Sequence, residues 1–480
     1  MRLRQRILKG GAELIVGQIG EQALSFLRNM IVARILSPDD FGVAATFTLI
    51  MTTLQMISDM AFGRFIVQAS DGDSPVLQNT THSVMLARGL LTGGLLILVA
   101  PMLGILFGIP EVTWAYAWLA LAPIIRGLGH SDVNRFQREL KFRSQIGISF
   151  FSQLTAFLAA VGLAFWLKSY EAILWSTIVQ ALAWTTASHI FAERRYRLGW
   201  SPEVFRRLWV FGWPLMINGM ILFSANLGDR FLVGAAFSMS ELALYSLAGA
   251  VVFVPSLLTT PISGTLFLPL LSQVKDDRQQ FRRRHGFLGI VVGILTIGLI
   301  VPLIALGSAI LPLIFGAHYV PPDFLVAFLA VASGMRICRS WAMTTAISIG
   351  RTRSLMYANF LRLTGIASGA IAVGAGYGLV VVAAAIAGAE FVATVYAIFK
   401  VNRDAALPRY KGIGVLGTIV AAYAISLMIL DVWRGDYIVV TLSAAVTIVI
   451  ALTMLILSSA DARNYGRALV SSAVLSAKPD

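Results

Sequence analysis

Long apolar stretches, separated by short clusters of polar residues, run along nearly the whole chain. A membrane-spanning helix needs about 20 mostly apolar residues. Breaking the chain at its polar clusters gives fourteen such stretches, at residues 12–36, 41–68, 82–107, 112–130, 146–167, 172–192, 211–236, 242–269, 287–315, 324–349, 355–375, 378–399, 412–430 and 438–458. We therefore predict an all-α integral membrane protein of about fourteen transmembrane helices.

Basic residues gather in every second connection between these stretches. With a cytoplasmic N-terminus, 27 lysines and arginines lie in inner connections, whereas only Lys168 and Arg434 lie in outer ones. Membrane proteins keep basic residues in their cytoplasmic loops, so this distribution predicts that both termini are cytoplasmic. One span too many or too few would reverse the side of every later loop, so the regular alternation supports the count of fourteen.

The composition argues against several classes of function. Hydrophobic residues make up 57% of the 480 residues and charged residues 13%, against about 25% charged in soluble domains. A single cysteine, Cys338, excludes a disulfide framework and Cys-built metal sites, and no P-loop is present. Because all outer connections are short, we expect no catalytic domain outside the membrane. We predict a protein that is not an enzyme and uses no cofactor or metal. Its five histidines show no ligand spacing: His82, His130, His189, His285 and His318.

The three longest inner connections, 131–145, 193–210 and 270–286, are basic and partly amphipathic. Such segments are typical of short helices that lie along the anionic inner leaflet. We expect each of them to be such a helix rather than a binding site.

A weak internal repeat divides the chain into two halves. The first stretch ends in Ser37-Pro-Asp-Asp40 and the seventh in Ser238-Met-Ser-Glu241, at an offset of 201 residues. Six spans separate the two copies, an even number, so both copies have the same orientation across the membrane. Parallel repeats of this kind are typical of transporters whose pathway lies between two lobes.

The repeat predicts two parallel six-helix lobes followed by two extra helices. We expect the N-lobe at 1–192 and the C-lobe at 211–399, joined by a cytoplasmic linker at 193–210. Residues 400–458 would hold the two extra helices, and 459–480 a cytoplasmic tail.

Several segments resemble those of a known family. They read Phe26-Leu-Arg-Asn-Met-Ile-Val-Ala-Arg-Ile-Leu-Ser-Pro-Asp-Asp-Phe-Gly42, Arg135-Phe-Gln-Arg-Glu-Leu-Lys-Phe-Arg143, Asn226-Leu-Gly-Asp-Arg-Phe-Leu-Val-Gly234 and Leu244-Tyr-Ser-Leu-Ala248. Their order and spacing are similar to those of polysaccharide-transport (Wzx-type) flippases, over roughly residues 10–400. That family is part of the multidrug/oligosaccharidyl-lipid/polysaccharide exporter superfamily.

The resemblance implies a V-shaped central cavity between two lobes and an alternating-access mechanism. It implies movement of a polyprenyl-pyrophosphate-linked oligosaccharide from the inner to the outer leaflet of the bacterial cytoplasmic (inner) membrane. The transported unit would serve the synthesis of exopolysaccharide or of lipopolysaccharide O-antigen. The implied partners are membrane lipids and the glycan polymerase and glycosyltransferases of the same pathway, with no nucleic acid.

All nine basic residues inside the predicted spans are arginines, against five acidic residues. A charge inside a membrane is costly, so this surplus points to an anionic ligand, and arginine suits bidentate recognition of phosphate oxygens. We expect Arg34, Arg64 and Arg126, close to helix ends, to reach the interface. The expected substrate-binding residues are Arg28, Arg88, Arg230, Arg336, Arg339, Arg362, Asn218 and Asn226.

Two questions about the charged residues stay open. Arg336 or Arg339 could instead form a purely structural ion pair with Glu390. Desolvation raises the pKa of a buried carboxyl group, whereas neighbouring arginines lower it, so the sequence does not decide which acids titrate. The candidates for ion coupling are Glu21, Asp59, Asp229 and Glu390.

The leading hypothesis is a flippase for a lipid-linked oligosaccharide. The second is a related exporter, either of a peptidoglycan lipid precursor or of small-molecule drugs; an exporter of cationic drugs predicts surplus acid rather than surplus arginine. The third is a membrane enzyme of glycan assembly, against which the short outer loops and the missing catalytic cluster argue.

Overall fold

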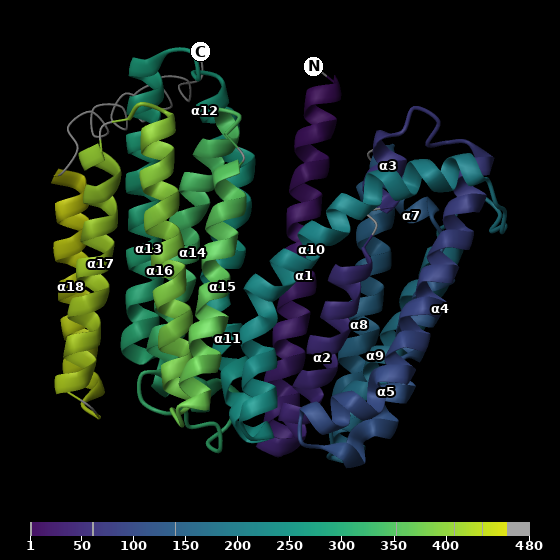
Figure 1. Ribbon diagram of the computed structural model, residues 1–480, viewed down its shortest axis with the longest axis horizontal. Coiled ribbons are helices and arrows are strands. Elements are labelled where there is room, and N and C mark those ends of the chain that lie inside the picture. The colour runs from purple at the N-terminus through teal and green to yellow at the C-terminus, as the bar shows by residue number, and fades with distance from the viewer. Residues whose placement is uncertain are drawn as a thin grey trace, which may run out of the picture. The chain divides into compact units, whose positions relative to one another are not determined.

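The computed structural model describes residues 2–59, 62–139, 141–351, 353–407, 409–433 and 435–457. Contacts between residues divide the chain into two compact units, Met1–Ala243 and Leu244–Asp480, termed here the N-terminal and C-terminal units. Within the described ranges both units consist of helices and turns, without a strand (Figure 1). The predicted all-α class is therefore confirmed.

The N-terminal unit combines long helices with several short ones. Ser37 and Ser201 cap α2 and α10, since each side chain accepts a hydrogen bond from a backbone N–H of the first turn. A proline follows each cap, where its missing N–H has no cost. The helices are α1 (Arg2–Ile35), α2 (Pro38–Ser58), α3 (Phe62–Gln68), α4 (Pro75–Leu106), the 3-10 turn η1 (Pro110–Val112), α5 (Thr113–Leu119), α6 (Leu121–Gly127), α7 (Asp132–Arg138), α8 (Phe142–Leu167), α9 (Glu171–Ile190), α10 (Pro202–Ala236) and the start of α11 (Met239–Ile262).

The C-terminal unit is a bundle whose long helices run side by side (Figure 1). Asp277 caps the longest of them, because its side chain accepts hydrogen bonds from the N–H groups of Gln279 and Gln280. After the end of α11, the elements are the π-helical turn η2 (Ser263–Phe267), α12 (Leu268–Ser272), α13 (Arg278–Phe315), α14 (Leu325–Ser348), α15 (Arg353–Gly374), α16 (Leu379–Asp404), α17 (Arg409–Val432) and α18 (Tyr437–Leu457).

Each of the fourteen predicted stretches coincides with one or more of these helices. By length and apolar composition, ten segments of the described chain qualify as membrane spans. The protein is therefore a multi-pass membrane protein. The count of fourteen is not confirmed by this measure and stays a prediction.

Three predicted spans are interrupted. The stretch 41–68 is divided between α2, which ends at Ser58, and α3, which begins at Phe62. The stretch 112–130 is divided at Ala120 into α5 and α6, near Pro123, which has no N–H to donate to the carbonyl four residues earlier. The stretch 242–269 leaves α-helical geometry after Ile262 and continues as the π-helical turn η2. Such turns are frequent at functional sites in helices.

The two repeated Ser-x-x-acid turns contact each other inside the N-terminal unit. Ser37 Oγ donates to Asp40 at 2.5 Å, and Ser238 Oγ donates to Glu241 at 2.8 Å, so both turns close in the same way. Asp39 of the first turn accepts hydrogen bonds from the N–H and Oγ of Ser240 in the second, at 3.1 and 2.6 Å. The sequence repeat thus corresponds to a structural one.

The predicted linker 193–210 lies within the N-terminal unit. Its residues from Pro202 onward form the first turns of α10, where Val204 and Leu208 join a buried cluster with residues of α3 and α4. Figure 1 shows this part of α10 beside α3, across one end of the unit. The predicted lobe boundaries stay a prediction, and the predicted tail 459–480 lies outside the described residues.

Candidate functional site

Four charged residues singled out from the sequence converge in the C-terminal unit. Arg336 and Arg339 lie on α14, Arg362 on α15 and Glu390 on α16. Glu390 Oε1 accepts hydrogen bonds from Arg336 Nε at 2.6 Å and from Arg362 Nε at 2.8 Å. Glu390 Oε2 lies 3.2 Å from Arg339 Nη2. One carboxylate thus contacts three guanidinium groups, and we term these four residues the arginine cluster.

Small residues and a threonine hold the three helices close enough for these contacts. A Cβ atom at Gly365 of α15 would lie only 2.8 Å from the nearest side-chain atom of α16. Thr394 Oγ1 of α16 donates a hydrogen bond to the carbonyl oxygen of Met335 at 2.9 Å, which ties α16 to α14. Any larger residue at position 365 would therefore require α15 or α16 to shift.

The arginine cluster is almost entirely buried. The side-chain exposures are 11% for Arg336, 6% for Arg339, 4% for Arg362 and 2% for Glu390. A buried charge costs several kcal/mol unless it is paired. The sequence left open whether Arg336 or Arg339 forms an ion pair with Glu390, and both ion pairs are present. A substrate-binding role for the same arginines stays a prediction.

Arg336 also contacts α11, at Phe253, ten residues before the π-helical turn η2 begins. Its guanidinium group lies 4.7 Å from the centre of the Phe253 ring, a cation–π distance. Hydroxyl pairs connect α11 and η2 to α14 on either side of this contact, at 2.9 Å for Ser256–Ser333 and 3.1 Å for Ser263–Ser340. The cluster is therefore connected by polar contacts to the segment whose helical geometry is irregular.

The predicted arginines of the N-terminal unit lie on three separate helices. Arg28 of α1 is half-buried, with Nε and Nη2 each 3.4 Å from Asn29 Oδ1. Arg88 of α4 is also half-buried; its guanidinium lies 5.4 Å from the Phe62 ring, and Nη1 donates to the carbonyl of Ser58 at 3.5 Å. The structure thus gathers the predicted residues of the C-terminal unit, but not these.

The third helix is α10, which carries both predicted asparagines. Asp229 is buried and accepts a hydrogen bond from the N–H of half-buried Arg230 at 2.9 Å. Asn226 is partly buried, whereas Asn218 is exposed. Of the other two predicted acids, Glu21 is half-buried on α1 and Asp59 is exposed at the end of α2.

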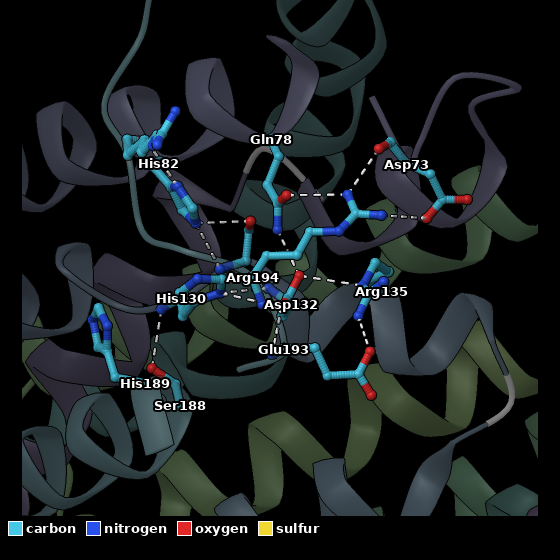
Figure 2. Close-up of polar contacts among 12 residues, drawn as sticks. Asp73, Gln78, His82, His130, Asp132, Arg135, Ser188, His189, Glu193 and Arg194 are labelled. Atoms are coloured by element: carbon cyan, nitrogen blue, oxygen red, sulfur yellow. Dashed lines mark hydrogen bonds and ion pairs between the residues drawn. The ribbon is translucent and has the colours of Figure 1, made fainter. Parts of the chain in front are cut away.

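A second polar cluster, which the sequence did not indicate, lies in the N-terminal unit (Figure 2). At its centre Asp132 of α7 is fully buried. Asp132 Oδ2 accepts hydrogen bonds from the N–H groups of Glu193 and Arg194, at 3.0 Å each. Asp132 Oδ1 accepts one from Gln78 Nε2 at 2.5 Å and lies 3.2 Å from Arg135 Nε. We term this group the Asp132 cluster.

Basic residues of the predicted inner connections are paired with acids in this region. Arg135 pairs with Glu139 at 3.0 Å and with Glu193, and Lys141 Nζ lies 2.8 Å from both of these carboxylates. Hydrogen bonds from Lys141 and Arg135 hold the pKa of Glu193 below its ordinary value. The short helix expected in 131–145 exists as α7, and its arginines pair with acidic residues of the protein; its predicted position along the inner leaflet stays a prediction.

Three histidines that are far apart in the sequence meet beside Asp132 (Figure 2). The ring centres of His82 and His130 lie 4.8 Å apart, and those of His130 and His189 lie 5.5 Å apart. His82 Nε2 accepts a hydrogen bond from the N–H of Ser131, so Nδ1 carries the proton and donates to the carbonyl of Arg197 at 3.0 Å. No His, Cys, Asp or Glu group in the described chain is arranged to hold a metal ion.

The Asp132 cluster fastens the segment between α9 and α10 to the rest of the unit. Besides Asp132 and His82, Ser83 binds this segment by accepting a hydrogen bond from the N–H of Gly199 at 3.1 Å. Arg194 Nη1 in turn donates to the carbonyl of Asp73 at 2.7 Å. This segment is irregular, so its backbone N–H and C=O groups have no partners within a helix. The buried polar side chains supply those partners.

Replacing Asp132 with alanine is expected to destabilise the protein by about 2–5 kcal/mol, because two backbone N–H groups and Arg135 lose a buried acceptor. Thermal unfolding of the purified protein in detergent measures the effect. Asp73→Asn is the matched control, since the Asp73 carboxylate is 54% exposed and its ion pairs are worth about 0–1 kcal/mol. Equal unfolding temperatures for both variants would contradict the assigned role of Asp132.

Comparison with known proteins matches residues 31–322 to a family described as polysaccharide biosynthesis protein. The chain is 23% identical to the teichuronic acid biosynthesis protein TuaB of Bacillus subtilis (strain 168), over 63% of each protein. It is 22% identical to the lipopolysaccharide biosynthesis protein WzxC of Escherichia coli (strain K12), over 66% of this chain and 65% of WzxC. It is 24% identical to the succinoglycan biosynthesis transport protein ExoT of Rhizobium meliloti (strain 1021), over 75% of this chain and 73% of ExoT. The chain thus spans slightly less than two thirds of TuaB and WzxC.

Solved structures share the fold over most of the chain. The lipid II flippase MurJ, in its inward closed conformation, superimposes with a TM-score of 0.67 and 14% identity, over 92% of this chain and 98% of MurJ. An inward-facing multidrug resistance MATE family transporter superimposes with a TM-score of 0.62 and 11% identity, over 80% of this chain and 94% of the transporter. At such identities the likeness establishes the fold alone.

Proposed function

The chain belongs to the polysaccharide biosynthesis protein family, and on that premise we propose that it is a flippase for a lipid-linked oligosaccharide. Its substrate would be a polyprenyl-pyrophosphate-linked oligosaccharide unit, moved from the inner to the outer leaflet by alternating access. The unit would then enter exopolysaccharide or lipopolysaccharide O-antigen synthesis. Family membership is the observation that carries this proposal, and a fold shared with a lipid II flippase agrees with it.

The arginines within the spanning helices support an anionic headgroup as the ligand. Arg28, Arg88 and Arg230 are half-buried and so remain within reach of a ligand, and a guanidinium fork fits phosphate oxygens. The arginine cluster is buried in this conformation and would add positive potential to the C-terminal unit; direct contact of Arg336, Arg339 and Arg362 with the pyrophosphate stays a prediction. Asn218 and Asn226 would contribute neutral hydrogen bonds beside Arg230.

Two alternatives use the same fold. A peptidoglycan lipid precursor also carries a pyrophosphate, but the family favours a polysaccharide unit. An exporter of cationic drugs would need acidic residues along its pathway, whereas the clustered charges of the C-terminal unit are three arginines around one glutamate. The named relatives are transport and biosynthesis proteins, and we propose that this chain is not an enzyme.

Reconstitution in proteoliposomes tests the proposed function. A fluorescent polyprenyl-pyrophosphate-linked oligosaccharide is placed in both leaflets, and an impermeant glycosidase reports how much of it becomes accessible from outside. We expect all of the substrate to become accessible with the protein, against about half in protein-free vesicles. Equal accessibility in both preparations would refute the proposal, and faster flipping of lipid II than of the oligosaccharide lipid would favour the first alternative.

The membrane potential is expected to contribute to the cycle. An inside-negative potential is worth about 2.3 kcal/mol per charge per 100 mV and favours outward movement of an anionic headgroup. Setting the potential to zero with valinomycin and potassium should slow net flipping.

Any proton linkage is assigned to Glu21 or Asp229, so Glu21→Gln with Asp229→Asn should flatten the pH dependence of the rate. Flipping that ignores both changes would indicate a passive facilitator.

The proposed location is the cytoplasmic membrane, with both termini in the cytoplasm. In a Cys338→Ser background, single cysteines at Ser169 and Asp436 should react with an impermeant thiol reagent added to intact cells. Single cysteines at Asp277 and Asp404 should react only after the cells are opened. Labelling of position 277 from outside would overturn this topology.

A further inference from the structure

Arg339 is bound differently from the other two members of the arginine cluster. Arg336 and Arg362 each donate a hydrogen bond from Nε to Glu390 Oε1. Arg339 Nη2 lies 3.2 Å from Glu390 Oε2, and this oxygen has no hydrogen-bond partner among the described residues. Its Nε and Nη1 atoms are buried and have no hydrogen-bond partner among the described residues. Arg339 therefore has donors available inside the bundle, although the residue is only 5% exposed.

These donors need an acceptor that also carries negative charge. A guanidinium group does not lose its proton in proteins, so Arg339 stays positively charged. Its carboxylate partner is shared with two other arginines, so the three arginines and one glutamate of the arginine cluster carry a formal charge of +2 together. A buried water molecule would accept the hydrogen bonds but would add no charge. An anion would do both.

We propose that Arg339 binds a small monovalent anion of the halide class, with chloride as its natural occupant. Both donor atoms are buried, and a single small ion needs less room beside them than a phosphate. The nearby Glu390 carboxylate would repel a second negative charge, which again favours a monovalent ion over a divalent one. The anion is a resident counter-ion of the C-terminal unit, and the inference does not depend on which lipid is transported.

Thermal unfolding of the full-length protein in detergent tests this site. Unfolding is followed in sodium chloride, sodium bromide, sodium sulfate and sodium gluconate at equal ionic strength. Chloride and bromide are expected to raise the unfolding temperature by at least about 2 °C over gluconate, with saturation, because a ligand of the folded state alone stabilises it. Sulfate is excluded from protein surfaces and stabilises proteins without saturation, so it should give no saturating rise. Equal unfolding temperatures in chloride, bromide and gluconate, or a saturating rise with sulfate as large as with chloride, would overturn the proposal.

Two variants assign the effect to one side chain. Arg339→Gln should abolish the difference between chloride and gluconate, whereas Arg353→Gln, at an exposed position on α15, should keep it. A chloride effect that survives in Arg339→Gln would overturn the assignment. If that variant does not fold, wild-type crystals soaked in bromide provide the second measurement: an anomalous peak beside Arg339 is expected, and a map without one refutes the site. If the protein flips the oligosaccharide lipid normally but shows no halide effect, the anion site is refuted and the proposed function stands.

Discussion

Replacement of Glu390 by alanine is expected to remove most of the folded protein from the membrane. Arg336, Arg339 and Arg362 would lose the carboxylate that all three contact, and none of them can become neutral. Removing one partner of a buried ion pair costs about 3–5 kcal/mol, a large part of the stability of a typical domain. Immunoblots of membrane fractions and thermal unfolding of the purified variant measure the loss.

Arg336→Ala is the matched control for this prediction. Glu390 would keep two guanidinium partners, so protein abundance should stay close to that of the wild type. A Glu390→Ala protein that accumulates normally would contradict the structural role of the cluster. A different outcome would be loss of the protein from the membrane in Arg336→Ala and its recovery when Glu390→Ala is added to the same chain. That result would mean that the Arg336–Glu390 ion pair alone has the structural role.

Replacement of Arg28 by alanine is expected to lower flipping at least tenfold, while the protein remains in the membrane at normal abundance. Among the described residues, the half-buried guanidinium has the amide oxygen of Asn29, at 3.4 Å, as its hydrogen-bond acceptor, so the loss of the guanidinium leaves no acidic partner without its ion pair. A charge-assisted hydrogen bond to the substrate is worth about 1.5–3 kcal/mol, or a factor of roughly 10–150. The proteoliposome assay described above gives the rate.

Lysine at position 28 should restore part of the activity, because the charge survives whereas the bidentate fork is lost. Arg34→Ala is the control, an exposed arginine near the end of the same helix that should have little effect on flipping. A variant Arg28→Ala that flips at the wild-type rate would exclude this arginine from substrate binding.

The sequence by itself determined the class of the protein and the positions of its helices. Apolar stretches of about 20 residues can satisfy their backbone groups in a membrane only as helices, so hydropathy sets the fourteen predicted segments almost directly. The sequence also predicted a short turn after each of two helices. In the structure, Ser37 donates to Asp40 and Ser238 donates to Glu241, which closes these turns. The arginine surplus was also visible, because charges stand out in an apolar sequence.

Tertiary structure decided which of those charges meet. Arg336, Arg362 and Glu390 lie on three different helices, and the close contact at Gly365 brings two of these helices together. Nothing in the spacing of His82 or Asp132 indicated that they would surround the segment between α9 and α10. Contacts between helices depend on which faces pack together, and that is settled by side-chain shape across the whole bundle rather than by any local pattern.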